Sequence, residues 1–589
     1  MTKPHHLPTP AVLAVRTAAG TRMLRSVASL RAHSVSVLHD FAAGCARHPE
    51  RPLLVVPDGR TRRTYTWGDI GRMVADLAQG LLDADVGGAV VILSGPSASH
   101  LVVSLAAQSI GLPVVPISPA HSLKAVSRQR LQAMTAMVRP EVVFAESAEY
   151  LPAVRAIGAR LGLSAVPVDG MIECARFARP ATDAVSDARR RVGADTVAKI
   201  MFTSGSTGHP KGVVNTHGML SANQQQLRQI WPFVNTEPPV LVDWLPWSHT
   251  FGGNHNLNLV LGNGGTYWLD DATPDHVDRT IATVCAARPN LYFSVPLGYS
   301  RLVERLEADP STARRFLAGL DLICCAGAGM EQGVWERLRA LVRYSGSSAV
   351  LTSSWGLTET SPACTSAHFH TDDARNIGVP LPGVDLVLRD PGAGGKSEIA
   401  VRGPNVATRY LTVDGERPAV DTDGWLRTGD AGTLVEPENP SAGMRFDGRL
   451  AEDFKLSSGT FVDTATVRAR LLAAGRGLIR HVVLCGHDSA VVSAIVWLES
   501  GCAADDSVRA RLRDVLAVVA VDAGSSQRIE RVVVATTAPD PAAGEITDKG
   551  YVNQARVRAL RPELVERVVR GDDASVVHAP RSTGRSRRS

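Results

Sequence analysis

A run of hydroxyls, glycines and one lysine at residues 203–211 has the composition of a phosphate-binding loop. Apolar residues at 198–202 and 212–215 predict a strand on each side, so the polar run is expected to be a turn. Its hydroxyls, glycine N–H groups and lysine are donors uninterrupted by an acid, which suits phosphate oxygens. A flexible surface turn is the alternative on composition alone. The candidate phosphate ligands are Thr203, Ser204, Gly205, Ser206, Thr207, Gly208 and Lys211.

The order of residues in this loop differs from that of the Walker loop. Pro210 precedes Lys211, and no helix is expected to begin at the lysine. A second glycine-rich run at residues 392–397 has Asp390 where a Walker loop requires its first glycine. The sequence therefore predicts a phosphate site of another kind.

Two further segments carry residues that could do chemistry. His249 and His255 could be metal ligands or core histidines, and the lack of a nearby carboxylate or cysteine cluster disfavours metal binding. Residues 326–329 are alanine and glycine and follow a predicted buried strand. Such a strand end either lets a flat ring approach the backbone or forms a tight turn.

The order of these segments resembles that of the adenylate-forming enzymes, which include acyl-CoA synthetases, luciferases and peptide-synthetase adenylation domains. The resemblance covers roughly residues 36–570. Its motifs are Thr-Ser-Gly-Ser-Thr-Gly-His-Pro-Lys-Gly at 203–212, Pro-Trp-Ser-His at 246–249, Trp-Gly-Leu-Thr-Glu at 355–359, Arg-Thr-Gly-Asp at 427–430, Asp-Gly-Arg at 447–449 and Gly-Glu-Ile-Thr-Asp-Lys-Gly at 544–550.

The resemblance implies a binding site for ATP. The loop would hold the β- and γ-phosphates, and Trp355, in place of the family's tyrosine, would stack on adenine. Thr358 would donate to the α-phosphate, and Glu359 would hold the Mg²⁺ that ATP brings. Asp430 would accept hydrogen bonds from the ribose hydroxyls. The remaining implied nucleotide contacts are Gly327, Ala328, Gly356 and Arg449.

The resemblance also places the carboxylic acid. His249 would lie between the carboxylate pocket and the tunnel for the attacking thiol. The other residues expected to border the acid are Phe251, Asn254, Ala326 and Gly327.

Two lysines compete for the catalytic role. Lys549 occupies the place of the family's C-terminal lysine, although its register differs from the usual Thr-x-x-Gly-Lys pattern. Lys455 is similar in position to residues that serve the second half-reaction, thioester formation. The hinge position two residues after Arg449 is Ala451, where the family commonly has Asp or Lys.

Several segments are most similar to feruloyl-CoA synthases and related aryl-CoA ligases. The resemblance implies an aromatic acid such as ferulate, activated with ATP as an acyl-adenylate and passed to coenzyme A. We keep two alternatives: a stand-alone adenylating enzyme that uses an amine or a carrier-protein thiol, and a nucleotide-binding homologue without activity.

The elements that position these residues follow an alternating pattern. Short apolar strands alternate with helices from about residue 90 to residue 325, which predicts an α/β protein with mostly parallel sheets and helical crossovers. The resemblance adds a β-barrel-like subdomain and a small mobile α+β domain. The expected division is a large domain at 36–447, a hinge at 449–453 and a small domain at 448–570.

Composition limits the partners. The chain has 589 residues, 44% hydrophobic and 21% charged, with a net charge of +5. Segments 1–39 and 581–589 contain nine basic residues, so the remainder of the chain has a net charge of −4. A mildly acidic body predicts no nucleic-acid partner. We expect poorly ordered basic tails at 1–35 and 571–589. No run is long enough for a membrane span, and eight cysteines without metal or disulfide spacing indicate a cytoplasmic protein. A homodimer is left open.

Overall fold

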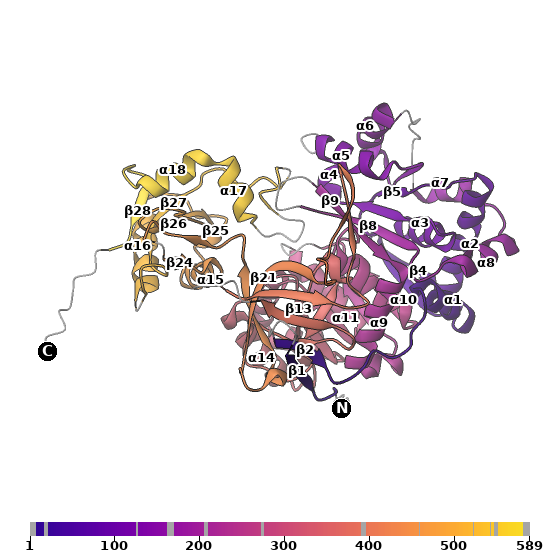
Figure 1. The fold of residues 1–589 in the computed structure, drawn as a ribbon, viewed down its shortest axis with the longest axis horizontal. Coiled ribbons are helices and arrows are strands. Elements are labelled where there is room, and N and C mark those ends of the chain that lie inside the picture. The colour runs from indigo at the N-terminus through magenta and orange to yellow at the C-terminus, as the bar shows by residue number, and fades with distance from the viewer. Residues whose placement is uncertain are drawn as a thin grey trace. The chain divides into compact units, whose positions relative to one another are not determined.

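The computed structural model divides into two compact units. The larger comprises Met1–Arg389, Ile399–Thr428 and Thr433–Arg445, and the smaller comprises Asp390–Glu398, Gly429–Gly432 and Phe446–Ser589 (Figure 1). The described residues are 7–16, 22–124, 128–161, 170–204, 210–272, 276–389, 396–458, 460–521, 523–541, 543–546 and 552–580.

One sheet of the larger unit has seven strands in the order β20-β19-β9-β8-β6-β5-β7. Strands β7, β5, β6 and β8 are parallel, whereas β8 pairs antiparallel with β9, and β9 with β19. The bounds are β5 (Val90–Leu93), β6 (Val114–Ile117), β7 (Val142–Ala145), β8 (Val197–Ser204), β9 (Pro210–Thr216), β19 (Arg409–Thr412) and β20 (Gly415–Pro418).

The second sheet has fifteen strands in the order β1-β2-β17-β18-β21-β22-β16-β15-β14-β13-β12-β10-β11-β3-β4. Its run from β14 to β3 is parallel, and the pairs β14–β15, β15–β16 and β16–β22 are antiparallel. The bounds are β1 (Val12–Arg16), β2 (Arg22–Ser26), β3 (Pro52–Asp58), β4 (Thr61–Thr66), β10 (Val240–Asp243), β11 (Thr266–Leu269), β12 (Leu291–Ser294), β13 (Leu322–Ala326), β14 (Val350–Gly356), β15 (Ala363–Ser366), β16 (Asn376–Pro380), β17 (Asp385–Arg389), β18 (Glu398–Arg402), β21 (Leu426–Leu434) and β22 (Met444–Arg449).

Helices connect the parallel strands, as the alternating sequence pattern predicts. Helix α2 begins at a capping box of Thr66 and Asp69, and the Thr216 side chain caps α9. The bounds are α1 (Val37–Arg47), α2 (Trp67–Asp83), α3 (Ala98–Ser109), α4 (Pro119–Ser122), α5 (Arg128–Val138), α6 (Leu151–Leu161), α7 (Gly170–Phe177), α8 (Asp183–Arg191), α9 (His217–Ile230), α10 (Leu257–Gly262), α11 (Val277–Ala287), α12 (Pro296–Ala308), α13 (Pro310–Leu317) and α14 (Gln332–Ser345).

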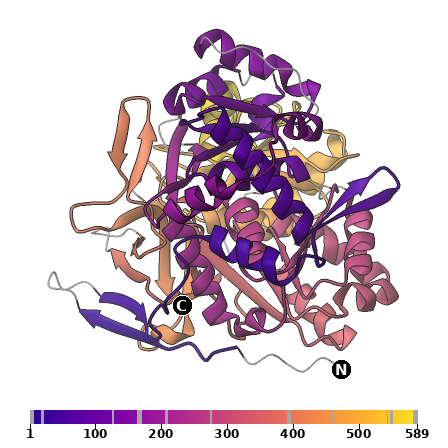
Figure 2. The ribbon, with the colours of Figure 1, turned by 90° about the vertical axis from the view of Figure 1, so that its right-hand side faces the viewer.

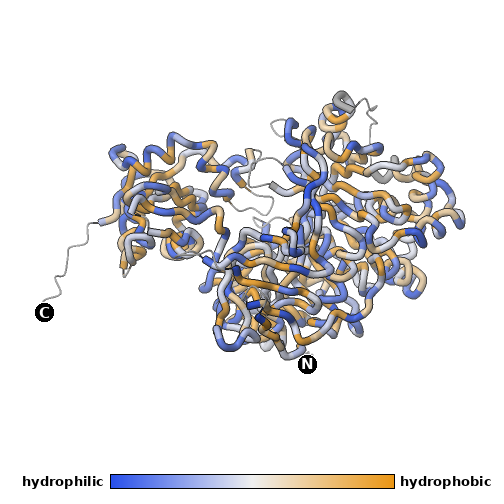
Figure 3. The backbone as a smooth tube through the Cα atoms, viewed as in Figure 1, coloured by the Kyte–Doolittle hydropathy of each residue, from blue (hydrophilic) through white to orange (hydrophobic). Residues whose placement is uncertain are grey.

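Hydrophobic residues are concentrated along the inner strands (Figure 3). One core joins helices α11 to α14 to strands β12 to β14 around the fully buried Tyr299, Phe316 and Trp335. None of the described helices is long and apolar enough to cross a membrane. All eight cysteines lie within the described residues and are free thiols.

The N-terminal segment differs from the expected disordered tail. Strands β1 and β2 form a hairpin, and β2 pairs antiparallel with β17 (Figure 2, indigo beside orange). Arg25 lies directly opposite Asp385, with Nε 2.5 Å from Oδ1 and Nη2 2.8 Å from Oδ2. A basic residue of this segment is thus the cross-strand partner of an acid, a pairing that the sequence alone did not suggest.

The smaller unit contains a four-stranded sheet in the order β25-β26-β27-β28, formed by β25 (Ile479–Cys485), β26 (Val492–Leu498), β27 (Ile529–Val534) and β28 (Val576–His578). Its other elements are β23 (Phe454–Lys455), β24 (Phe461–Val462), α15 (Thr464–Ala474), α16 (Asp506–Ala520), α17 (Gln554–Leu560) and α18 (Pro562–Arg570). Pro562 separates α17 from α18, because proline disfavours the helical conformation of the preceding residue. Strand β28 lies within the expected C-terminal tail.

Candidate active site

The predicted phosphate loop lies in the chain between the paired antiparallel strands β8 and β9, which we call the phosphate hairpin. Thr203 pairs with Lys211 across the two strands, so both ends of the loop are fixed by the sheet. The Thr203 hydroxyl oxygen is buried and has no hydrogen-bond partner among the described residues. Gly205, Ser206, Thr207, Gly208 and the side chain of Ser204 lie outside the described residues, so their phosphate contacts stay a prediction.

The structure brings Lys211 and Glu359 together. Lys211 Nζ lies 2.9 Å from Glu359 Oε1 and 3.9 Å from the centre of the Tyr410 ring. The Tyr410 hydroxyl donates a hydrogen bond of 3.0 Å to the same Glu359 oxygen. Burial, together with the nearby Glu359 carboxylate, raises the pKa of Tyr410, so this phenol keeps its proton and donates. The sequence carried no motif that pointed to Tyr410.

The backbone around Glu359 is held on several sides. Thr358 and Glu359 lie in a short 3-10 helix, Thr358–Thr360, just after strand β14. The Asn215 amide donates to the Thr358 carbonyl at 3.2 Å, and the Ala407 N–H donates to the Glu359 carbonyl at 2.7 Å. These contacts fix the direction in which the Glu359 carboxylate points.

The expected adenine surface is formed by the ends of two paired strands. Strand β13 runs parallel to β14, and Ala326 pairs with Ser354, so the segment from Gly327 to Gly329 emerges beside Trp355. Gly327 has a φ of +88°, which glycine adopts without strain. A Cβ at Gly356 would lie 1.8 Å from the Pro362 carbonyl oxygen, so no side chain fits there. The structure thus places Ala326, Gly327 and Trp355 together, while their contact with a nucleotide stays a prediction.

Two of the residues expected to border the acid, Phe251 and Asn254, lie on an unusual helix. The segment Phe251–Asn256 is a π-helix, a form that occurs frequently at functional sites, and all six of its residues are buried. His249 Nδ1 accepts from the Phe251 N–H at 3.3 Å, which places any proton of the neutral ring on Nε2. Asn254 Nδ2 donates to Asn215 Oδ1 and to Thr250 Oγ1, both at 3.1 Å. Asn215, which the sequence did not single out, thus contacts both this helix and the turn that carries Glu359.

Phe251 and His255 pack in an aromatic cluster. The His255 ring contacts Phe251 and Phe293 edge to face, with ring centres 5.5 and 5.1 Å apart, and Trp231 completes the cluster. Burial lowers the pKa of His255 to about 4, so the ring is neutral near pH 7. No group of three or more metal-binding side chains occurs among the described residues.

Two predicted nucleotide ligands meet in the smaller unit. Asp430, on β21, is 3% exposed, and the Arg449 Nε lies 3.4 Å from its Oδ1. Lys455 is exposed at the end of β23, while Lys549 lies outside the described residues.

Residues 41–411 match the family of AMP-binding enzymes, which is more than half of the chain. The chain belongs to this family. This AMP-binding enzyme is 30% identical over 404 residues to a 3-(7a-methyl-1,5-dioxo-octahydroinden-4-yl)propanoyl:CoA ligase of Rhodococcus jostii (strain RHA1), and the alignment covers 65% of this chain and 74% of the relative. It is 25% identical over 558 residues to 4-coumarate–CoA ligase 3 of Oryza sativa subsp. japonica, covering 90% of this chain and 93% of the relative.

The AMP-binding enzyme also shares its fold with solved structures. The anthranilate CoA ligase AuaEII in complex with anthranoyl-AMP aligns with a TM-score of 0.71 at 17% identity, covering 90% of this chain and 97% of that chain. The α/β adenylate-forming fold, with a large N-terminal domain of mixed sheets and a small α+β C-terminal domain, is therefore confirmed. The expectation of mostly parallel sheets holds only for the inner strands.

Proposed function

We propose that this AMP-binding enzyme is an ATP-dependent CoA ligase that activates an aromatic carboxylic acid, such as ferulate or another hydroxycinnamate. The observation that carries the proposal is the contact of Lys211 with Glu359, which joins the end of the phosphate hairpin to the proposed metal carboxylate. The named coumarate and anthranilate CoA ligases among its relatives support an aromatic acid. The finer resemblance to feruloyl-CoA synthases stays part of the proposal.

The proposed chemistry begins with attack of a carboxylate oxygen on the α-phosphorus of ATP. The bond to the β-phosphate breaks, and the products are acyl-AMP and pyrophosphate. Lys211 and the hairpin donors bind the β- and γ-phosphates, Thr358 donates to the α-phosphate, and Asp430 orients the ribose. Lys549 stabilises the charge that develops on the α-phosphate.

The Glu359 carboxylate fits the proposed magnesium. Mg²⁺ prefers oxygen ligands and usually binds one or two carboxylates together with substrate phosphates. Glu359 is only 10% exposed in its side chain, and Lys211 and Tyr410 hold it in one orientation. When bound, the ion would neutralise phosphate charge during the attack.

The second proposed half-reaction transfers the acyl group to the sulfur of coenzyme A. The thiol loses its proton to solvent and attacks the acyl carbonyl, the C–O bond to AMP breaks, and AMP leaves. His249 borders the path of the thiol, and Lys455 serves this step. Withdrawal of Lys549 by movement of the smaller unit would open the carbonyl to the thiol.

The test is a pyrophosphate-release screen with ATP and Mg²⁺, with and without CoA. Its panel contains ferulate, coumarate, benzoate, anthranilate, a ring-bearing propanoate and fatty acids. We expect acid-dependent pyrophosphate and, with CoA present, AMP and a thioester in equal amounts. Pyrophosphate without thioester would favour an amine or carrier-protein acceptor, and no pyrophosphate with any acid would favour the inactive homologue.

Two lysine variants separate the half-reactions. Lys549→Ala is expected to lower adenylation by about 100-fold or more, since it removes charge stabilisation from the transition state. Lys455→Ala is expected to preserve pyrophosphate release and to slow thioester formation from preformed acyl-AMP. The reverse pattern would contradict the assignment of Lys549.

A further inference from the structure

The π-helix Phe251–Asn256 packs backbone to backbone on the preceding segment. A Cβ at Gly253 would lie 2.2 Å from the Trp247 carbonyl oxygen, and one at Gly252 would lie 2.6 Å from that of Pro246. Neither position leaves room for a side chain, so a small shift of this helix would also move residues 246–249. Whatever holds the π-helix therefore also sets the position of His249.

A buried lysine of the phosphate hairpin contacts this helix. Lys199 lies within β8, is 6% exposed, and its Nζ donates a hydrogen bond of 2.7 Å to the Gly253 carbonyl. Among the described residues, no carboxylate forms an ion pair with it. A buried ammonium without a countercharge is costly, and burial lowers the pKa of Lys199 to about 8. Such a costly group calls for a function beyond packing.

The residue opposite Lys199 makes the next contact along the helix. Lys199 pairs with Asn215 across the β8–β9 ladder, so their side chains share one face of the sheet. Asn215 Oδ1 accepts from Asn254 Nδ2 at 3.1 Å. Two facing residues of the phosphate hairpin therefore bind consecutive residues of the π-helix.

The far end of the π-helix is held by the other sheet. Asp243, at the end of β10, accepts from Asn256 Nδ2 at 2.7 Å, from the Leu245 N–H at 2.9 Å and from the Tyr267 hydroxyl at 2.6 Å. The helix is thus fixed independently at Asn256, and loss of the Lys199 contact would release only its first part.

We propose that Lys199 is a positioning residue that couples the phosphate hairpin to the acid-binding segment by holding Gly253. The inference rests on the proposed function, because it assigns the acid to the segment that contains His249. Through Lys199, the strand that leads into the phosphate loop also orients the wall of the acid pocket. The proposed role of Lys199 is to hold the phosphate-binding and acid-binding regions in a fixed position relative to each other, without contacting either substrate.

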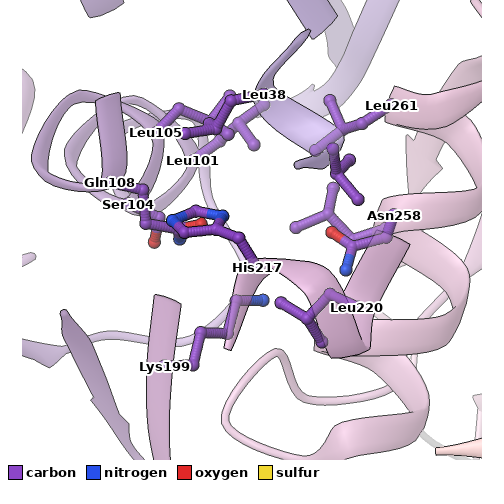
Figure 4. Close-up of a pocket in the computed structure, with 12 residues that line it drawn as sticks. Leu38, Leu101, Ser104, Leu105, Gln108, Lys199, His217, Leu220, Asn258 and Leu261 are labelled. Atoms are coloured by element: carbon purple, nitrogen blue, oxygen red, sulfur yellow. The ribbon is translucent and has the colours of Figure 1, made fainter. Parts of the chain in front are cut away.

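The surroundings of Lys199 allow a conservative replacement. The lysine lines a small cavity of about 20 Å³ together with His217, Gln108 and Asn258 (Figure 4). Burial lowers the pKa of both His217 and His100 to about 4, so both neighbouring rings are neutral near pH 7. Methionine fits this volume without adding charge, so Lys199→Met should fold and remove only the ammonium and its hydrogen bond.

The first experiment measures hydrogen exchange of the full chain without substrates. In Lys199→Met, amides of residues 249–254 should exchange about tenfold faster, while those of β10 and the Asn256 end stay unchanged. Lys124→Met, which replaces an exposed lysine, is the matched control and should match the wild type. Unchanged exchange at 249–254, or equal acceleration across the whole unit, would overturn the proposal.

The second experiment measures kinetics with the best acid from the panel. Lys199→Met should raise the KM for the acid about tenfold and leave the KM for ATP within about twofold, because the phosphate loop itself is intact. A loss confined to kcat, or an equal rise in both KM values, would overturn the coupling. Lys199→Gln, which retains an N–H donor, provides a second variant and should give an intermediate effect. If the wild type activates no acid, the proposed function fails, and the exchange result still decides the role of Lys199.

Discussion

Three side chains from distant parts of the sequence contact one another in the candidate site: Lys211, Glu359 and Tyr410. The lysine neutralises the carboxylate, the phenol donates to the same oxygen, and the lysine lies over the phenol ring. A cation above an aromatic ring and a charge-assisted hydrogen bond are each worth about 1–2 kcal/mol when partly buried. Tyr410 therefore orients both of the groups that are proposed to meet ATP.

Tyr410→Phe tests this role at the residue scale. The change removes the hydrogen bond to Glu359 and keeps the ring beneath Lys211. We expect kcat/KM for ATP to fall about fivefold to tenfold, equivalent to roughly 1 kcal/mol, with an unchanged KM for the acid. Steady-state pyrophosphate release measures both values.

The matched control is Tyr344→Phe, which alters an exposed tyrosine at the end of α14. If the two variants behaved alike, Tyr410 would have no role in orienting Glu359.

At the scale of elements, the residue between helices α17 and α18, Arg561, forms an ion pair with Glu545. Arg561, at the break between them, places Nε 2.6 Å from Glu545 Oε1 and Nη2 2.6 Å from Oε2, and its guanidinium lies over the Trp497 ring. Although burial raises it, the hydrogen bonds from Arg561 hold the pKa of Glu545 below its ordinary value. The Glu545 carbonyl also accepts from the Asn553 N–H at 2.8 Å. This hydrogen bond joins the residues on the two sides of the segment that contains Lys549, and the ion pair with Arg561 holds Glu545 in place.

Arg561→Ala should destabilise the smaller unit. It leaves the carboxylate of Glu545, which is 2% exposed, without its partner, and breaking such a pair costs about 3–5 kcal/mol. Hydrogen exchange in strands β25 to β27 should accelerate, while exchange in β12 to β14 of the larger unit stays unchanged.

Arg513→Ala, at an exposed position on α16, serves as the control and should change stability by less than about 0.5 kcal/mol. A small effect at Arg561 would mean that Glu545 is solvated when its partner is removed.

At the scale of the whole molecule, buried histidines dominate the response to acid. Burial lowers the pKa of each of these histidines to about 4: His100, His217, His255 and His368. Their unfolded pKa is about 6.5, so the unfolded chain binds more protons than the folded one between about pH 4 and pH 6.5. Their contribution to stability is present above pH 6.5 and is lost as the pH falls. Asp243 and Asp270 oppose them, because burial raises the pKa of both carboxyl groups, that of Asp243 to about 6.

We therefore expect the free energy of unfolding of the larger unit to fall by at least about 3 kcal/mol between pH 6.5 and pH 4.5, since four histidines outweigh two carboxyl groups. Urea unfolding at several pH values measures this change. His255→Phe should flatten the dependence, because phenylalanine fits the aromatic cluster and binds no proton.

His487→Gln, which replaces an exposed histidine, is the control and should leave the slope unchanged. A stability that rises on acidification would show that Asp243 and Asp270 outweigh the histidines.

The sequence by itself determined the local chemistry of this protein. Hydroxyls, glycines and a lysine in a fixed order predict a phosphate-binding loop, and apolar strands alternating with helices predict an α/β fold, because both signals act within a few neighbouring residues. The strands on either side of the loop and the parallel inner strands followed from this pattern. The hairpin at β1 and β2 did not, because its partner β17 lies far along the chain.

Only the tertiary structure decided which side chains meet. Tyr410 reaches Glu359 because β19 pairs with β9, and strand pairing over such distances has no local signature. Lys199 was visible in the sequence as one charge within an apolar strand. Its partner Gly253 became known only once two sheets had packed around the π-helix, because burial and the direction of a hydrogen bond are properties of the packed chain.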